Sequence, residues 1–249
     1  MTLQKYYRTI VECGFYTNEK RLRQWINTLF GGIDFKDKNV LDIGGGVGKY
    51  AFYAAAMGAA RITILEPEGA GCKGGTIKNF ELLKSKFPEF DNILFIPTTF
   101  QNFTSDKRFD IIYLTSSINH LDEVACIKLL TDVDSKRTYE KLFEKMSNLC
   151  NPRADLLFSG CGRSNFFGDT GIRNFFAPNL EWEKHQDPGV WIKLLKPFGF
   201  EITEKKWRAP NRYGKLGKLL LANRVVSYFT SSNFYVKMKK LPVKEPTGV

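Results

Sequence analysis

A glycine-rich turn between two apolar runs constrains this sequence most. Residues 39–43 form a short apolar run interrupted by Asp42, and residues 44–48 read Gly-Gly-Gly-Val-Gly. The next run, 49–60, is rich in alanine and suits a helix. Glycines let the backbone turn sharply and approach a ligand closely, because they carry no Cβ atom. We therefore expect a buried strand, a tight turn and a helix in this stretch.

The alternation of strand and helix continues along the chain. Further strands are expected at 61–66, 92–96, 109–114, 154–159, 200–207 and 233–239. Further helices are expected within 1–36 and at 76–87, 139–149, 190–197 and 216–229. Apart from Asp110, the run at 109–114 is entirely apolar, which is typical of a strand covered by helices on both faces. This order predicts an α/β fold with a mostly parallel sheet.

The chain is long enough and apolar enough for a large core. It has 249 residues, of which 43% are hydrophobic, so a disordered or low-complexity protein is excluded. We expect one domain over residues 1–249. Within it we expect a helical cap (1–36), a core (37–207) that includes a lid (160–188), and a C-terminal region (208–249).

We expect a cytoplasmic protein, because the sequence shows no targeting signal and no cysteine spacing typical of disulfides. No apolar run reaches the roughly 18–20 residues that cross a bilayer, and the N-terminus lacks the apolar core of a signal peptide. The five cysteines include no Cys-x-x-Cys pair. We therefore expect reduced, mostly buried thiols rather than disulfides or a zinc site.

The net charge of +11 is concentrated at the C-terminus. Eleven Lys or Arg and only two Glu lie from Glu204 to Val249, so this segment carries nine of the eleven net charges. A basic segment suits an anionic substrate, a nucleic acid or a peripheral contact with an anionic membrane. Surface lysines that only increase solubility are the alternative interpretation.

An acid lies at the end of the strand that follows the glycine turn. Glu66 comes 22 residues after Gly44, close to the roughly 20 expected for a carboxylate that binds ribose hydroxyls. The dinucleotide-binding pattern Gly-x-Gly-x-x-Gly places its last glycine three residues on. Here the third glycine, Gly48, follows only two residues after Gly46. A nucleotide other than a dinucleotide is therefore favoured.

The pattern Asp-x-Gly-x-Gly-x-Gly resembles motif I of class I S-adenosylmethionine-dependent methyltransferases. The resemblance extends from about Val40 to Lys239 and implies a Rossmann-like, doubly wound, seven-stranded sheet whose last strand is antiparallel. It also implies S-adenosylmethionine as the cofactor. The implied cofactor-binding residues are Asp42, Gly44, Gly46 and Gly48 for the methionine part, Glu66 for the ribose, Thr99 and Phe100 for the adenine, and Thr115.

One position departs from that family. Thr99 stands where many members carry an aspartate. Its hydroxyl could accept from the adenine amino group, and Phe100 could stack or offer its amide. The alternative is that Thr99 only caps a turn.

The two histidines are the candidate catalytic bases. His120 follows the fourth strand, at the end of the sheet where ligands bind in this class of fold. Methyl transfer is an in-line displacement, and a hydroxyl acceptor must also lose its proton, which a histidine can accept near neutral pH. His185 is the rival base. For both, the alternative is a histidine bonded only to protein groups.

The predicted lid and the N-terminus supply the candidate substrate residues. A segment of about 25 residues without clear periodicity is usually functional in a compact domain. The candidates are Arg163, Asn165, Phe166 and Tyr7. Aromatic and amide side chains suit an uncharged ring or sugar, and an arginine suits an anion. Core packing is the alternative for the aromatic side chains.

Missing motifs narrow the substrate class. Thr115-Ser116-Ser117-Ile118 stands where methyltransferases of exocyclic base amines or glutamine carry Asn/Asp-Pro-Pro-Tyr, and no Pro-Cys or Thr-Cys pair marks a cytosine-C5 enzyme. No strong set of metal ligands is present. The sequence therefore predicts methyl transfer to an oxygen, or with less support a nitrogen, of a small, anionic or sugar-like metabolite. An RNA methyltransferase that uses the basic C-terminal region is the alternative.

Overall fold

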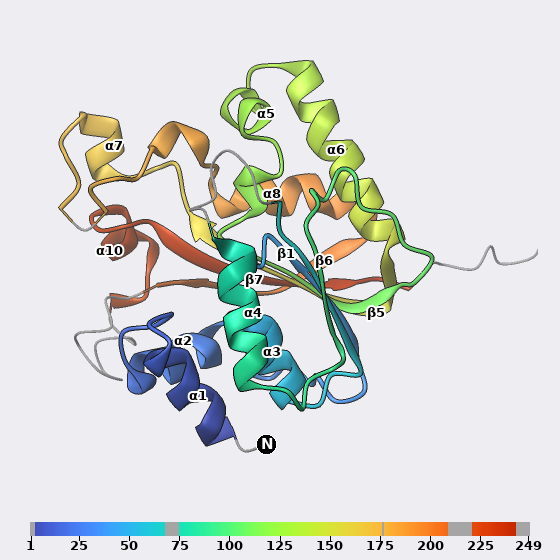
Figure 1. The fold of residues 1–249 in the computed structure, drawn as a ribbon. Helices are drawn as coiled ribbons and strands as arrows, with labels where there is room; N and C mark the ends of the chain where they lie inside the picture. Colours follow the sequence, from blue (N-terminus) through green and yellow to red (C-terminus); the bar gives the residue numbers. More distant parts are fainter. Residues whose placement is uncertain (1–2, 68–74, 176, 209–220, 243–249) are drawn as a thin grey trace, which may run out of the picture. The chain divides into compact units, whose positions relative to one another are not determined.

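The computed structural model describes residues 3–67, 75–175, 177–208 and 221–242 (Figure 1). The chain forms two compact units, the first unit at Met1–Thr115 and the second unit at Ser116–Val249. Within the described residues, no helix combines the length and the apolarity needed to span a membrane.

The first unit contains four parallel strands in the order β3-β2-β1-β4. Val40 in β1 pairs with Ile62 in β2 and with Ile111 in β4, so β1 lies inside the sheet. The strands of this unit are β1 (Asn39–Ile43), β2 (Arg61–Leu65), β3 (Ile93–Ile96) and β4 (Phe109–Thr115). Its helices are α1 (Leu3–Glu12), α2 (Glu19–Phe30), α3 (Lys49–Ala56) and α4 (Thr76–Lys86).

Helices α1, α2 and α3 pack side by side through aromatic side chains (Figure 1). The ring of Phe30 in α2 contacts Phe35, Tyr50, Tyr53 and Tyr113 at centroid distances of 5.2–5.8 Å. Tyr6 in α1 is fully buried and donates a hydrogen bond to the carbonyl of Lys49 over 2.8 Å. The N-terminal helices are therefore anchored directly at the start of α3.

The second unit contains three strands in the order β5-β7-β6. Strand β7 (Asn233–Lys240) is antiparallel to both β5 (Cys150–Cys161) and β6 (Phe200–Trp207). The helices of this unit are α5 (Glu123–Lys128), α6 (Val133–Asn148), α7 (Phe166–Thr170), α8 (Pro188–Leu195) and α10 (Arg224–Tyr228). Its short 3-10 turns are η1 (Ile118–His120), η2 (Trp182–Lys184) and η3 (Lys196–Phe198).

The predicted elements occur with shifted ends. All seven expected strands are present, and the prediction of an antiparallel last strand is confirmed. Helix α6 begins six residues before the expected 139, because the side chain of Asp132 accepts a hydrogen bond from the Ser135 amide and caps the helix. Of the helix expected at 216–229, the residues up to 220 lie outside the described part, and α10 covers residues 224–228 of the rest.

Two helices were not expected, α7 within the predicted lid and α5 before α6. The side chain of Asp122 accepts a hydrogen bond from the Ala125 amide over 2.9 Å, and this cap starts the six-residue helix α5. An aspartate before a short run of helix formers was the signal in the sequence. The cap sets the start of α5 at Glu123, whose side chain lies beside His120.

Candidate functional site

The glycine turn of the first unit has the backbone that its glycines predict. Gly44, Gly46 and Gly48 adopt φ angles of +70°, +54° and +78°, which only glycine adopts readily. A Cβ atom at Gly45 would lie 2.6 Å from Oδ2 of Asp42 and from Ile64. At Gly46, in contrast, an added Cβ would meet no heavy atom within 4 Å. The turn therefore packs tightly against β1 and β2 and is open at Gly46.

Glu66 lies against this turn, as its spacing suggested. Its Oε2 atom accepts a hydrogen bond from the Gly46 amide over 2.8 Å, and its side chain is buried. The contact holds the carboxylate of the second strand beside the open glycine. A sugar hydroxyl brought to this point would meet both a carboxylate and exposed backbone.

Asp42 is a buried acid whose oxygens have no hydrogen-bond partner at bonding distance within the part of the chain that the structure describes. It is 0% exposed. Burial raises the pKa of Asp42 well above its usual range, while the neighbouring Tyr113 and Lys49 oppose that rise. Buried polar groups are normally hydrogen-bonded, so unsatisfied oxygens at a glycine turn fit a ligand that supplies donors. The amino-acid end of S-adenosylmethionine carries such donors.

The remaining predicted cofactor residues, and Tyr7 from the predicted substrate residues, also lie in the first unit. Thr99 caps a turn, since its hydroxyl accepts from the Asn102 amide over 3.3 Å, and the Phe100 ring is buried. Thr115 is the half-buried last residue of β4. Tyr7 is also buried, and the Arg23 guanidinium stacks on its ring at 3.8 Å.

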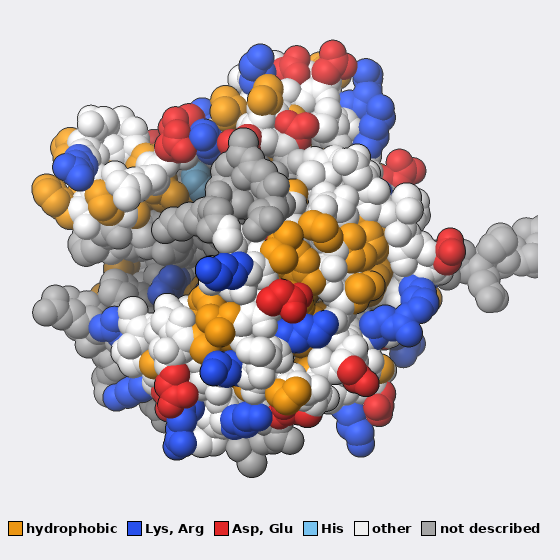
Figure 2. All heavy atoms as spheres, viewed as in Figure 1, with side chains coloured by type: hydrophobic (Ala, Val, Ile, Leu, Met, Phe, Trp, Pro, Cys, Tyr) orange, Lys and Arg blue, Asp and Glu red, His pale blue; other side chains and the backbone are white. Residues whose placement is uncertain are grey.

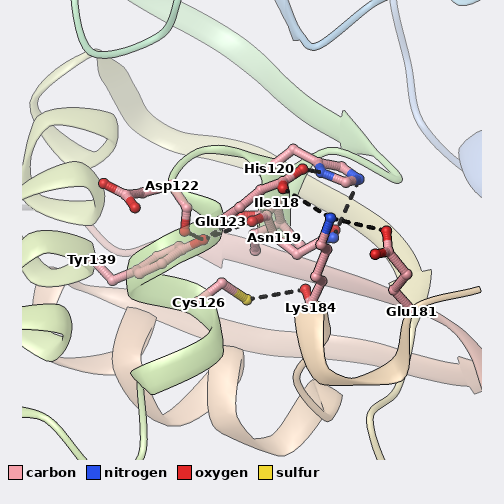
Figure 3. A network of polar contacts seen from close by, with 9 residues as sticks. All are labelled: Ile118, Asn119, His120, Asp122, Glu123, Cys126, Tyr139, Glu181 and Lys184. Atoms are coloured by element: carbon pink, nitrogen blue, oxygen red, sulfur yellow. Dashed lines mark hydrogen bonds and ion pairs between the residues drawn. The ribbon is translucent and has the colours of Figure 1, made fainter. Parts of the chain in front are cut away.

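In the second unit, His120 is oriented by a carboxylate. Its Nδ1 atom lies 2.6 Å from Oε1 of Glu123, and its Nε2 atom lies 3.3 Å from Nδ2 of Asn119 (Figure 3). Because a carboxylate accepts and an amide nitrogen donates, these contacts place the ring proton on Nδ1 and leave Nε2 as the acceptor. The hydrogen bond with His120 lowers the pKa of Glu123, which keeps that carboxylate ionised.

Further side chains hold this pair in place (Figure 3). Lys184 lies 3.5 Å from Oε2 of Glu123 and 2.9 Å from a carboxylate oxygen of Glu181. The buried hydroxyl of Tyr139 lies 3.2 Å from each of three backbone carbonyls, those of Ile118, Asn119 and Asp122. The turn that carries His120 is therefore tied to α6 and to the segment at 181–184.

The second histidine lies near the first but in a different environment. His185 is buried, and burial, followed by the proximity of His120, lowers its pKa to about 4. Its Nδ1 atom has no hydrogen-bond partner within the described residues. His185 is therefore a neutral side chain at physiological pH, whereas the His120 side chain is half-exposed and paired with a carboxylate.

The predicted lid divides into packed and exposed parts. Nδ2 of Asn165 lies 2.9 Å from the Tyr228 carbonyl and 3.1 Å from the Thr230 carbonyl and from Oγ of Ser232, so protein groups engage this fully buried amide. Phe166 packs on Phe167, Tyr228 and Phe229. Figure 2 shows hydrophobic side chains exposed around α7, and Phe175 is 82% exposed. Arg163 is exposed and donates to the Ile127 carbonyl over 3.3 Å.

Within the described residues we find neither a reactive thiol nor a cluster of metal ligands. The cysteines described there, at 13, 126, 150 and 161, are free thiols. Burial raises the pKa of both Cys126 and Cys150 to about 12, so neither provides a thiolate. No group of three His, Cys, Asp or Glu side chains suited to a metal ion occurs in this part of the chain.

The sequence interpretation missed three residues that the structure brings to these sites. Glu123 follows His120 by three residues, so their spacing on a turn was a usable signal. Lys184 comes from a segment about 60 residues away and had no local signal. Lys49 directly follows the glycine turn, and its side chain influences the charge of Asp42.

Comparisons with known proteins agree with this geometry. The sequence model of a methyltransferase domain matches residues 15–240. No curated protein matches significantly. Similar solved structures include a putative sarcosine dimethylglycine methyltransferase from Galdieria sulphuraria, at TM-score 0.60 and 13% identity, covering 90% of this chain and 87% of that one. The N-methyltransferase NodS from Bradyrhizobium japonicum WM9, in complex with S-adenosyl-L-homocysteine, has TM-score 0.54 and 14% identity, covering 89% and 86%.

A further similar structure shows how far fold likeness reaches. The [4+2]-cyclase SpnF has TM-score 0.58 and 12% identity, covering 90% of this chain and 82% of that one. That protein is named for a cyclisation, so these likenesses establish the Rossmann-like fold and no particular reaction. The family assignment depends instead on the domain model, which spans most of the sequence. The chain thus belongs to the methyltransferase domain family, and the prediction of a class I S-adenosylmethionine-dependent methyltransferase is confirmed.

Proposed function

We propose that this enzyme transfers the methyl group of S-adenosylmethionine to a hydroxyl oxygen of a small molecule, with His120 as the general base. The bound cofactor supplies an electrophilic methyl group on its sulfonium sulfur. The observation that carries the proposal is the 2.6 Å contact between Nδ1 of His120 and Glu123. An oxygen acceptor needs a base to remove its proton, and this pair has the chemistry of one.

The cofactor residues of the proposal all come from the first unit. Asp42 would accept from the methionine part, the glycine turn would let the cofactor approach the backbone, and Glu66 would bind the ribose hydroxyls. Supporting this are the unsatisfied oxygens of Asp42 and the Glu66 carboxylate beside Gly46. We assign the adenine to the turn at Thr99 and Phe100, and we retain Thr115 as a residue of the cofactor site.

The proton transfer follows from the tautomer of His120. With its Nδ1 proton donated to Glu123, the imidazole offers the Nε2 lone pair to the acceptor hydroxyl, which takes the place of the Asn119 amide at that nitrogen. As the oxygen takes the methyl group and the methyl–sulfur bond breaks to release S-adenosylhomocysteine, the hydroxyl proton would move to Nε2 of His120. The ionised Glu123 stabilises the imidazolium that results, and the half-exposed ring then releases the proton to water.

His185 is the weaker candidate for the base. A histidine whose pKa is about 4 is neutral at pH 7, and it binds a proton poorly. The burial that lowers this pKa also penalises an imidazolium at this position. We therefore assign the base role to His120 alone.

A small acceptor fits the described basic side chains better than RNA does. Lys206 pairs with Glu204 at 2.5 Å, and Lys239 pairs with Asp155 at 3.0 Å. Lys240 donates to the Phe198 carbonyl over 2.6 Å. Lysines engaged in this way are less available to phosphates. In the proposal Arg163 and Phe166 contact the acceptor, while Tyr7 and Asn165 support the fold around the sites.

The experiment is a methyl-transfer screen with labelled S-adenosylmethionine. Small-molecule hydroxyls, amines and total RNA are offered as acceptors, and label is followed into each fraction. We expect label in a hydroxyl acceptor and a decrease in kcat of roughly 100-fold or more in His120→Ala. The variant should retain its affinity for S-adenosylhomocysteine, measured by calorimetry. Label in the RNA fraction would favour the alternative, and an unchanged kcat in the variant would remove the base role.

A further inference from the structure

The Lys49 side chain is a half-buried ammonium beside the glycine turn, and the proposed function gives it no role. It is the first residue of α3, directly after Gly48. Its Nζ atom lies 4.9 Å from the ring centroid of Tyr50 and 5.8 Å from that of Tyr16. Across the described residues it forms neither an ion pair nor a side-chain hydrogen bond. A cation in this position lacks an anionic partner.

Asp42 is near Lys49 but does not pair with it. Each group favours the charged form of the other, and yet the Asp42 oxygens stay without a hydrogen-bond partner in the described chain. An acid and an ammonium thus lie close in space, and the described residues offer neither of them a hydrogen-bonded partner. A buried or half-buried charge is unfavourable unless a partner compensates it. A ligand with two opposite charges would compensate both.

The structure holds Lys49 in place from two helices. The Tyr6 hydroxyl of α1 donates to the Lys49 carbonyl over 2.8 Å, which fixes the backbone. The Trp25 indole of α2 donates to the Tyr50 hydroxyl over 2.7 Å, which fixes one of the rings beside the ammonium. Such support is typical of a side chain that is preorganised for binding.

We propose that the Lys49 ammonium binds the α-carboxylate at the amino-acid end of the cofactor. An α-amino acid carries a carboxylate and an ammonium on one carbon, and Lys49 and Asp42 offer the complementary charges. The contact is a charge-assisted hydrogen bond, which is about twice as strong as a neutral one. This inference depends on the proposed function, because it assigns one residue within the cofactor site.

The test removes the charge from the protein and the carboxylate from the ligand in turn. Calorimetry measures the binding of S-adenosylhomocysteine and of its decarboxylated analogue to the wild type and to Lys49→Met. We expect the wild type to bind S-adenosylhomocysteine about 10- to 100-fold more tightly than the analogue. In Lys49→Met the two ligands should bind about equally. Lys84→Met is the matched control, because Lys84 also lies over a ring, that of Phe80, but is exposed.

The outcomes separate this inference from the proposed function. If the wild type binds neither ligand, the proposed function fails together with the inference. If both ligands bind, but the preference for the carboxylate persists in Lys49→Met, only the inference is overturned. If the wild type itself does not prefer S-adenosylhomocysteine over the decarboxylated analogue, the inference is also overturned. This comparison uses the wild type alone, so it does not depend on the folding of a variant. Lys49→Arg, which retains the charge, should keep most of the preference.

Discussion

Nδ1 of His120 lies 2.6 Å from Oε1 of Glu123, and the other carboxylate oxygen of Glu123 lies 3.5 Å from the Lys184 ammonium. The carboxylate thereby orients the imidazole on one side and is itself oriented on the other. In an enzyme, such an arrangement selects one tautomer and stabilises the imidazolium formed when the ring accepts a proton.

Replacing Glu123 by glutamine should disturb both the tautomer of His120 and the reaction. Since glutamine carries no charge, it no longer stabilises the imidazolium, and we expect kcat to fall by roughly 10- to 100-fold. The tautomer is read from the ring nitrogens by long-range proton–nitrogen NMR, which is simple because the chain has two histidines. His120→Asn identifies the signals. A single Nδ1–H tautomer retained in Glu123→Gln would contradict the orienting role.

Replacing Asp42 by asparagine should stabilise the cofactor-free enzyme while weakening cofactor binding. The unfolded carboxyl has an ordinary pKa of 3.8, and burial raises the pKa in the folded state. The unfolded state therefore releases its proton first, and stability decreases as the pH rises from about 4 toward the folded-state pKa. We expect a higher Tm for Asp42→Asn at pH 7 and a lower affinity for S-adenosylhomocysteine.

Asp110→Asn is the matched control for that prediction. The Asp110 carboxylate in β4 accepts a hydrogen bond from the Asn39 amide over 2.9 Å. Its replacement should lower the Tm, because the neutral amide oxygen of asparagine is a weaker acceptor for the Asn39 amide than a carboxylate is. A lower Tm in both variants would show that the Asp42 carboxylate is not unfavourable in the folded protein.

Tyr139→Phe should destabilise the protein and slow the reaction. The change removes a buried hydroxyl that lies 3.2 Å from the Ile118, Asn119 and Asp122 carbonyls, at a cost of about 1 kcal/mol in the free energy of unfolding. We expect kcat to fall more than the affinity for S-adenosylhomocysteine, because the loosened turn carries His120. Tyr235→Phe is the control, since the buried Tyr235 hydroxyl has no partner among the described residues. An equal loss of stability in both variants would show that the contacts of the Tyr139 hydroxyl with the three carbonyls do not stabilise the turn.

Asn165→Ala should loosen the segment around α7. Besides the contacts of its Nδ2 atom, the side-chain oxygen accepts from the Phe167 amide over 3.0 Å. Losing these buried bonds should cost roughly 2–3 kcal/mol in the free energy of unfolding. Urea denaturation measures the loss, and hydrogen exchange should show faster exchange between residues 165 and 175. Asn179→Ala, an exposed position in the same segment, should leave both unchanged.

His185 should make the fold sensitive to acid. The unfolded histidine binds a proton near pH 6.5, whereas the folded one binds it near pH 4. Stability contributed by the neutral side chain is therefore lost as the pH falls from about 6.5 to about 4. His185→Gln does not titrate, so its Tm should decrease less between pH 7 and pH 5 than the wild-type Tm does. Parallel decreases in the two proteins would rule out His185 as the source.

The sequence by itself determined the order of elements and the position of the glycine turn. The Asp-x-Gly-x-Gly-x-Gly pattern, the seven apolar runs and the acid at Glu66 are local signals, each read within a few residues or at a known spacing. Such signals survive because turn geometry, helix caps and strand patterning depend on near neighbours. The shifted start of α6 and the unexpected α5 are capping effects of Asp132 and Asp122. Each cap is a local signal in the sequence as well.

Only the tertiary structure decided which ionisable groups lack partners and which have shifted pKa values. The motif marks Asp42 as a cofactor residue, but only the fold shows that its burial leaves both oxygens without a partner among the described residues. His120 and His185 look alike in the sequence, but burial lowers the pKa of one and a carboxylate orients the other. Desolvation and pairing depend on segments far apart in the chain, such as Lys184 beside Glu123. The charge state of a side chain is therefore a property of the fold.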